Sequence, residues 1–109
     1  MGRRCKNSVL GGMFMYGYVY KTTDLTNNKI YIGQHRAISF NPNYLGSGIA
    51  IKDAVAVKGK HNFKVEIIES YDTQSELDAG EIYYIYKLTS QDRDIGYNIA
   101  DGGGGAILR

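Results

Sequence analysis

The sequence predicts a small α+β domain built from a β-hairpin, a third strand and two helices. Three observations support this fold class. Two short tyrosine-bearing stretches flank a polar turn, residues 62–69 alternate apolar and polar side chains, and the segment after Thr73 has helical spacing behind a capping pattern. With 109 residues, the chain is long enough for one hydrophobic core.

The hairpin is predicted from two strands, over residues 15–21 and 29–34. Each alternates apolar and polar-tipped residues, as a half-buried strand does. Residues 24–29 are polar and rich in Asn, so they supply the turn that reverses the chain. Alternation then places Tyr18 and Tyr20 on one face and allows Tyr31 to lie opposite them, as neighbouring phenols.

A long loop is predicted over residues 35–47, and it contains the only proline. Loops of this length in a small domain are often functional. His35 and Arg36 begin the loop, and Tyr44 lies further along it. An arginine can bind phosphate with two donors and a histidine can act as acid, base or donor, so both are candidate phosphate ligands.

A helix is predicted over residues 49–58, with Ser47 as its N-cap and Gly59 as its stop. The β-branched residues of this segment also alternate as a strand would, which leaves that alternative open. The helical interpretation depends on the two caps and on one stripe, formed by Ile51, Ala54, Val55 and Lys58.

The third strand is predicted over residues 62–69 and can join the sheet of the hairpin. A second helix follows, because Thr73 and Glu76 form a capping-box pattern. Its apolar stripe consists of Leu77, Tyr84, Ile85 and Leu88.

Glu81 lies in the middle of that stripe, four residues after Leu77 and four before Ile85. An ionised carboxylate is seldom buried unless it is paired or bound to a metal ion. Glu81 is therefore the sharpest candidate for a functional residue. The alternative is a glutamate at the edge of the stripe that reaches solvent or pairs with a lysine.

The two ends of the chain differ from its middle. Residues 1–12 are basic and bury little, so we expect a flexible leader. Residues 102–109 begin with four glycines and are expected to form a glycine-rich tail. The folded domain is predicted to cover residues 13–101.

Composition limits the possible functions. The formal net charge of +2 permits nucleic-acid binding without arguing for it. Cys5 is the only cysteine, which excludes an internal disulfide and a cysteine-based metal cluster, and fits the reducing cytoplasm. The chain has no long apolar run, so no membrane segment is expected.

The two tyrosine stretches resemble the signature of the GIY-YIG endonuclease superfamily, and the resemblance extends from about residue 17 to residue 100. They are Gly17-Tyr18-Val19-Tyr20 and Tyr31-Ile32-Gly33. The resemblance implies a small sheet of three antiparallel strands flanked by helices. Two further stretches are similar to the phage-borne, free-standing branch that includes homing-type nucleases: Tyr31-Ile32-Gly33-Gln34-His35 and Tyr44-Leu45-Gly46-Ser47-Gly48.

The resemblance also implies the chemistry. Glu81 matches the family's metal-binding glutamate and would hold Mg²⁺ or Mn²⁺, while Asn98 matches an asparagine that helps to organise the site. The activity would be metal-dependent hydrolysis of a DNA phosphodiester by water. Tyr31, together with Tyr20, would orient or deprotonate that water, which requires a nearby cation because a phenol has a pKa near 10.

One family feature is missing. The catalytic arginine usually follows the second motif by about two helical turns, where this chain has only residues 37–40. His35 or Arg36 would replace it, and Lys52 is a more distant candidate. The predicted contacts to nucleic acid are Tyr18, His35, Arg36 and Lys52.

Two other functions stay open. The missing arginine allows a catalytically weak or inactive nucleic-acid-binding module with the same fold, and a repair-type nuclease for branched DNA is a further possibility. DNA is the expected partner, a homodimer on DNA is possible, and neither a membrane nor a small-molecule cofactor is expected.

Overall fold

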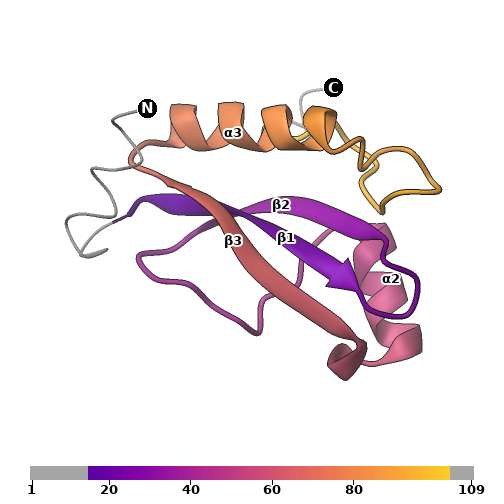
Figure 1. Cartoon of the computed structure of the whole chain (residues 1–109). Coiled ribbons are helices and arrows are strands. Elements are labelled where there is room, and N and C mark those ends of the chain that lie inside the picture. Colours follow the sequence, from indigo (N-terminus) through magenta and orange to yellow (C-terminus); the bar gives the residue numbers. More distant parts are fainter. Residues whose placement is uncertain (1–14, 104–109) are drawn as a thin grey trace.

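The computed structural model describes residues 15–103 and contains every predicted helix and strand. Labels follow Figure 1. The elements in chain order are β1 (Gly17–Asp24), β2 (Ile30–Arg36), α2 (Ile49–Lys58), a short 3₁₀ helix η1 (Lys60–Asn62), β3 (Phe63–Tyr71) and α3 (Gln74–Lys87). The predicted leader and residues 104–109 of the predicted tail lie outside the described residues.

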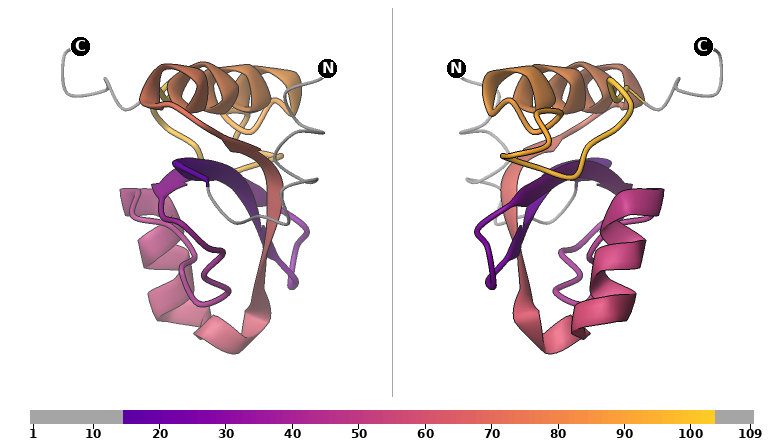
Figure 2. Two further views of the ribbon diagram at one scale, coloured as in Figure 1. Left: turned by 90° about the vertical axis from the view of Figure 1, so that its left-hand side faces the viewer. Right: turned by 90° about the vertical axis from the view of Figure 1, so that its right-hand side faces the viewer.

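The three strands form one antiparallel sheet in the order β2-β1-β3. Helix α3 lies across one face of the sheet, whereas α2 and the loop before it lie on the opposite side (Figures 1 and 2). The predicted fold class is therefore confirmed. A β-bulge between Val19 and Tyr20 shifts the register of β1 against β3, so that Tyr20 pairs with Ile67.

Each face of the sheet has its own hydrophobic cluster. The alternation of β1 sends Val19 toward α3 and Tyr18 and Tyr20 toward the opposite face. The cluster under α3 contains Val19, Ile32, Tyr71, Leu77 and Ile85. The opposite cluster contains Tyr18, Tyr20 and Val65, with Tyr31, Tyr44 and Leu45 partly buried against it.

Helix α2 has the predicted bounds but not the predicted N-cap. Gly48 occupies the cap position with φ −66° and ψ 155°, and no side chain caps the helix, so the assignment of Ser47 as N-cap was wrong. Gly59 ends the helix with φ 93°, as expected. Ile51 is fully buried, whereas Val57 is 83 % exposed, which explains why the β-branched pattern alone was ambiguous.

Helix α3 begins at the predicted cap. The Thr73 hydroxyl oxygen accepts a hydrogen bond from the Glu76 N–H at 3.1 Å. The Glu76 carboxylate accepts from the Asp72 N–H at 3.3 Å, one residue before the donor of a regular capping box. Leu77 and Ile85 are buried, as the stripe predicts.

The segment after α3 returns to the sheet. The Ile30 N–H donates to the carbonyl oxygen of Ile95, and the Tyr97 N–H donates to that of Ile30, at 3.0 and 2.8 Å. These bonds form a parallel bridge along the outer edge of β2. The segment therefore covers part of an edge strand and brings residues 97–103 beside α3. Among residues 15–103, no helix has the length and apolar character needed to cross a membrane.

Candidate active site

A cavity of about 380 Å³ lies where β1 and β2, the start of α2, α3 and the C-terminal segment meet. Its lining includes four residues that the sequence predicts for the site: Tyr20, Tyr31, Glu81 and Asn98. Its principal polar side chains come from Tyr20, Tyr31, Gln34, Glu81, Tyr97 and Asn98, and the start of α2 contributes Ser47, Gly48, Ile49 and Ala50. Two exposed isoleucines lie among the lining residues, Ile49 (74 % exposed) and Ile99 (68 % exposed).

Tyr20 is the most deeply buried phenol of the cavity, with 1 % of its surface exposed. Its ring lies across Gly33, where a Cβ atom would be 2.3 Å from the Tyr20 hydroxyl oxygen. The glycine of the second motif is therefore required by the tyrosine of the first. Tyr20 lines the cavity, and its hydroxyl has no hydrogen-bond partner among the described residues.

Tyr31 lies beside Tyr20, with ring centroids 6.2 Å apart, so the predicted pair of neighbouring phenols is present. The pKa of Tyr31 is raised to about 12, mainly by burial and further by the nearby charges of Glu81 and Tyr44, while a backbone hydrogen bond from Gly48 opposes the rise. Burial also raises the pKa of Tyr20, with the same carboxylate among the smaller causes. Both phenols are therefore neutral near pH 7.

Glu81 projects from the middle of α3 and is 8 % exposed. Its Oε1 atom accepts hydrogen bonds from Nε2 of Gln34 at 2.8 Å and from the N–H of Gly103 at 2.7 Å. Its other oxygen accepts none from the described residues. The carboxylate is thus held firmly by one oxygen while the second stays open toward the cavity.

This arrangement fits a divalent cation. Glu81 is the only acidic side chain among the lining residues, and no group of three or more His, Cys, Asp or Glu residues within 15–103 could hold a metal ion. Mg²⁺ often takes one or two protein carboxylates and completes its shell with water and substrate phosphate. An open carboxylate oxygen in a cavity suits that pattern.

Asn98 acts through β2. Its side chain accepts from the Ile32 N–H and donates to the Ile32 carbonyl, each at 2.8 Å, as a neighbouring strand would. Both the oxygen and the NH₂ group of the Asn98 amide are therefore bonded to Ile32, the residue between Tyr31 and Gly33. Asn98 therefore fixes the backbone that carries Tyr31, and the organising role that the resemblance implied stays a prediction.

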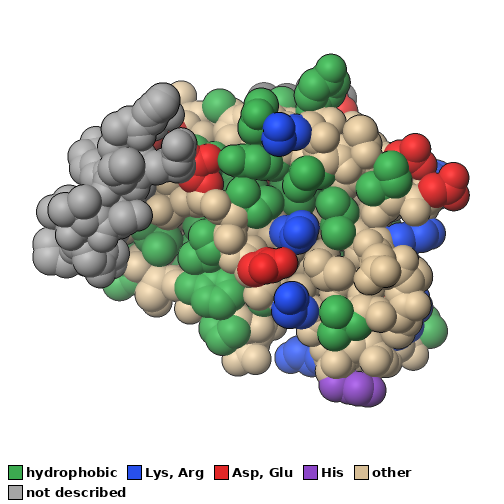
Figure 3. Space-filling model, viewed as in Figure 1, with side chains coloured by type: hydrophobic (Ala, Val, Ile, Leu, Met, Phe, Trp, Pro, Cys, Tyr) green, Lys and Arg blue, Asp and Glu red, His purple; other side chains and the backbone are tan. Residues whose placement is uncertain are grey.

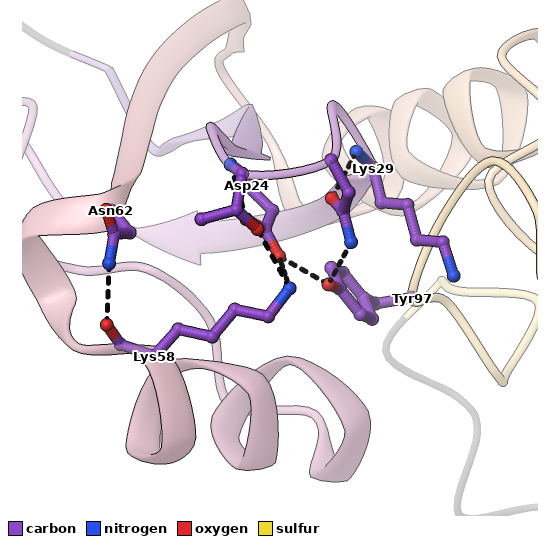
Figure 4. Close-up of polar contacts among 7 residues, drawn as sticks. Asp24, Lys29, Lys58, Asn62 and Tyr97 are labelled. Atoms are coloured by element: carbon purple, nitrogen blue, oxygen red, sulfur yellow. Dashed lines mark hydrogen bonds and ion pairs between the residues drawn. The ribbon is translucent and has the colours of Figure 1, made fainter.

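Tyr97 anchors the same segment at a second point, shown in Figure 4. Its hydroxyl donates to the Asp24 carboxylate at 2.5 Å, and Lys58 contacts the same oxygen at 2.7 Å. The other Asp24 oxygen accepts from the N–H and the hydroxyl of Thr26, at 2.9 and 2.6 Å. This Asp24 cluster (Asp24, Thr26, Lys58 and Tyr97) joins the hairpin turn, α2 and the C-terminal segment.

The predicted cationic candidates lie elsewhere. The His35 ring stacks on Tyr44 at 4.1 Å, and burial lowers its pKa, so His35 is neutral at pH 7. Arg36 donates to the Tyr16 hydroxyl at 3.0 Å. Lys52 lines a different cavity, between α2 and the preceding loop. None of the three lines the cavity of Glu81, so their roles stay predictions.

Tyr18, also a predicted contact to nucleic acid, is fully buried. Its hydroxyl accepts a hydrogen bond from the Asn41 N–H at 3.0 Å, and its ring contacts those of Tyr20, His35 and Phe40. These contacts hold the long loop against the sheet. Among the described residues, Tyr18 thus has a packing position, and its contact with nucleic acid stays a prediction.

Sequence reasoning missed Gln34 and Gly103, the two donors that hold Glu81. A signal existed for Gln34, because alternation places it on the same face of β2 as the buried Ile32. Gly103 belongs to the predicted tail, yet Gly102 and Gly103 lie against α3 with φ of 95° and 81°. A Cβ at Gly102 would be 2.8 Å from Cδ1 of Ile85, which explains why glycine is needed there.

Comparison with known proteins identifies the class. Residues 16–97 match the GIY-YIG catalytic domain family, and this range contains both tyrosine motifs and Glu81. The match covers most of the chain. The chain therefore belongs to the GIY-YIG family of endonuclease domains, as the two motifs predicted.

Similar proteins occur in Enterobacteria phage T4. The segE protein, named as a proposed endonuclease, is 38 % identical over 94 residues, which are 86 % of this chain and 45 % of segE. Endonuclease segA is 36 % identical over 91 residues, which are 83 % of this chain and 40 % of segA. The predicted relation to phage-type members is confirmed. The chain spans less than half the length of these relatives.

A solved structure supports the fold. The catalytic domain of the intron endonuclease I-TevI, in a mutant form, aligns with a TM-score of 0.60 and 21 % identity. The alignment covers 81 % of this chain and 97 % of that domain. At this identity the similarity concerns the architecture alone.

Proposed function

We propose that this chain is a divalent-metal-dependent DNA endonuclease of the homing or phage-encoded type. The observation that carries the proposal is the meeting of Tyr20, Tyr31 and Glu81, from three different elements, in one cavity. A neutral phenol pair beside a carboxylate with one open oxygen suits phosphodiester hydrolysis. The names of the phage relatives point to the same reaction.

In hydrolysis, the oxygen of a water molecule bonds to phosphorus and that water gives up a proton to a base, while the bond from phosphorus to one ester oxygen breaks and this oxygen takes up a proton from solvent. Glu81 would hold Mg²⁺ or Mn²⁺, which would stabilise charge on the phosphate and on the leaving oxygen. Gln34 and Gly103 keep the carboxylate in place through its other oxygen.

Tyr31 is the candidate base for the attacking water. Its pKa of about 12 means that little phenolate exists at pH 7. The charge of Glu81 is one cause of that high pKa, so neutralising this carboxylate makes the phenol easier to deprotonate. Tyr20, still more buried, is suited to donate a hydrogen bond from its neutral hydroxyl.

A nucleic-acid-binding module without turnover is the second candidate. It is favoured by one observation: among the described residues, no Lys, Arg or His lines the cavity.

A single cavity of this kind cuts one strand at a time, so a double-strand cut would require two copies on the DNA. Having only one cysteine, the chain suits the reducing cytoplasm, where we place its activity.

The test is nicking of supercoiled plasmid by the purified protein with Mg²⁺, with Mn²⁺ and with EDTA. We expect nicking only with metal, and a loss in Glu81→Gln at least as large as the ~100-fold that removal of an outer-shell partner can cause. Glu66→Gln is the matched control, because Glu66 is exposed on β3 and its carboxylate contacts Lys21 at 3.7 Å.

The two candidates give different results. Nicking that persists in EDTA, or a fully active Glu81→Gln, would contradict the proposed metal site. Salt-sensitive binding of DNA without any product would favour the module without turnover.

A further inference from the structure

The cavity holds a carboxylate but no cationic side chain from the described residues, which is unexpected for a site that must bind a phosphate. The negative charge of Glu81 by itself repels phosphate. On the face shown in Figure 3, Lys and Arg side chains are separated by hydrophobic and acidic ones and form no continuous basic surface. Apart from the proposed metal ion, any positive potential at the cavity must therefore come from a source other than these side chains.

The start of α2 is such a source. Ser47, Gly48, Ile49 and Ala50 line the cavity. The first N–H with a helical acceptor is that of Lys52, which donates to the Gly48 carbonyl at 3.0 Å. The preceding N–H groups of the helix, on Ile49, Ala50 and Ile51, have no acceptor among the described residues.

Nothing within residues 15–103 competes for these donors. Gly48 provides no capping side chain, and the first turn of α2, all of which is described, carries no acidic residue. The helix has ten residues, so its partial positive charge at the N-terminus is developed. Free N–H groups together with this charge form a common binding site for anions.

An independent observation on the opposite side of the cavity also points to a ligand. Only 1 % of the surface of Tyr20 is exposed, the residue lines the cavity, and its hydroxyl has no hydrogen-bond partner within residues 15–103. A hydroxyl that faces a cavity and has no protein partner is a donor available to a ligand. Tyr31 lies between the two features. Its ring neighbours that of Tyr20, and its hydroxyl oxygen would be 3.1 Å from a Cβ atom added at Gly48.

We propose that the N–H groups at the start of α2, together with the Tyr20 hydroxyl, bind the phosphate of the substrate and take over the role of the missing arginine. The inference rests on the proposed function, because it assigns the phosphate site of the same cavity. It also assigns a role to Gly48, where any side-chain cap would occupy the donors.

Phosphate binding is measured directly by titrating the metal-free protein with inorganic phosphate at constant ionic strength, with chloride as the reference salt. We expect the amide signals of residues 49–51 to shift in NMR spectra with phosphate and not with chloride. Equal shifts with both salts, or shifts confined to other residues, would overturn the proposal.

Ile49→Pro is the sharpest variant for this titration. Proline is favoured at the first helical position and removes only one N–H, and Gly48 already has the extended conformation that a following proline requires. The control is Ile49→Ala, which shortens the same exposed side chain and keeps the N–H. We expect phosphate to bind about tenfold more weakly to the proline variant than to the alanine variant. Equal affinity would overturn the proposal.

The variant Ala50→Asp distinguishes a loss of phosphate binding from a loss of folding. An aspartate in the first turn stabilises a helix but repels phosphate, so we expect an unchanged or higher Tm together with strongly reduced nicking. Ala50→Asn is the uncharged control. If the unmodified protein and Ala50→Asp nick equally, the inference fails while the proposed function stands. If phosphate binds at α2 but plasmid is never nicked, the inference stands and the proposed function fails.

Discussion

Residues 15–103 contain two buried carboxylate side chains in very different surroundings. Asp24, in the Asp24 cluster, is fully buried, and both of its oxygens are occupied by four hydrogen bonds. Glu81, in the cavity, is buried almost as deeply but has only one oxygen occupied. The phenols differ in the same way, because the Tyr97 hydroxyl has protein partners and the Tyr20 hydroxyl has none among the described residues.

This contrast separates stability from function. A buried polar group with all its hydrogen bonds formed stabilises one arrangement of the chain. A buried polar group with an unused donor or acceptor costs stability, and it is maintained where a ligand completes it. We therefore expect substitutions in the Asp24 cluster to change unfolding, and substitutions in the cavity to change catalysis.

The largest effect is expected for Tyr31→Phe. Loss of a general base lowers a rate by about 10²- to 10⁴-fold, and this variant removes only the hydroxyl. The free energy of unfolding should fall by only about 1 kcal/mol, because the ring and its packing are kept and only the hydrogen bond from the Gly48 N–H is lost. Plasmid nicking and urea unfolding of the same preparation measure the two quantities. Normal nicking by Tyr31→Phe would exclude Tyr31 as the base.

Asp24→Ala should have the opposite profile. It leaves Lys58 and the Tyr97 hydroxyl without their acceptor, so we expect a loss of about 3 kcal/mol of unfolding free energy. Chemical denaturation measures this loss. Any fall in nicking should be reversed by conditions that restore folding, whereas a fully stable but inactive variant would place Asp24 in the catalytic machinery.

The acid stability of the protein should depend on Asp24. Burial alone would raise the pKa of this carboxyl, but hydrogen bonds from Lys58, Thr26 and Tyr97 outweigh burial and hold the pKa well below its usual value. The folded state then binds fewer protons than the unfolded state below about pH 4, so stability is lost as the pH falls. The unfolding free energy, measured from about pH 5 down to about pH 2, should depend less on pH in Asp24→Asn than in the unmodified protein. An unchanged acid dependence would show that other carboxyls control it.

The contrast also shows what the sequence could reveal. The strands were predictable from alternation, α3 from Thr73 and its stripe, and Glu81 from its place in that stripe. The burial of Asp24 was not predictable, because an aspartate at a turn is ordinary and its partners Lys58 and Tyr97 lie 34 and 73 residues away.

The cationic residues next to the second motif lie away from the cavity for a related reason. Strand β2 continues through Arg36, so alternation directs His35 and Arg36 to opposite faces of the sheet. His35 then packs on Tyr44 and Arg36 reaches Tyr16. Closeness to Tyr31 in sequence did not bring either side chain to the cavity, whereas Gly48 reaches it through the fold.

The smallest effect is expected on the unfolding free energies of two variants, Tyr20→Phe and Tyr97→Phe. Both remove a phenol oxygen, one in the cavity and one in the Asp24 cluster, so they compare the two regions directly. Tyr97 loses a hydrogen bond to a charged group, so we expect Tyr97→Phe to cost about 1.5 kcal/mol of unfolding free energy. Tyr20 loses a hydroxyl that has no partner among the described residues, so its variant should be as stable as the unmodified protein or slightly more stable. Thermal and urea unfolding of both variants measure the difference. If Tyr20→Phe is the more destabilised of the two, its hydroxyl has a structural partner and the distinction between the cavity and the Asp24 cluster fails.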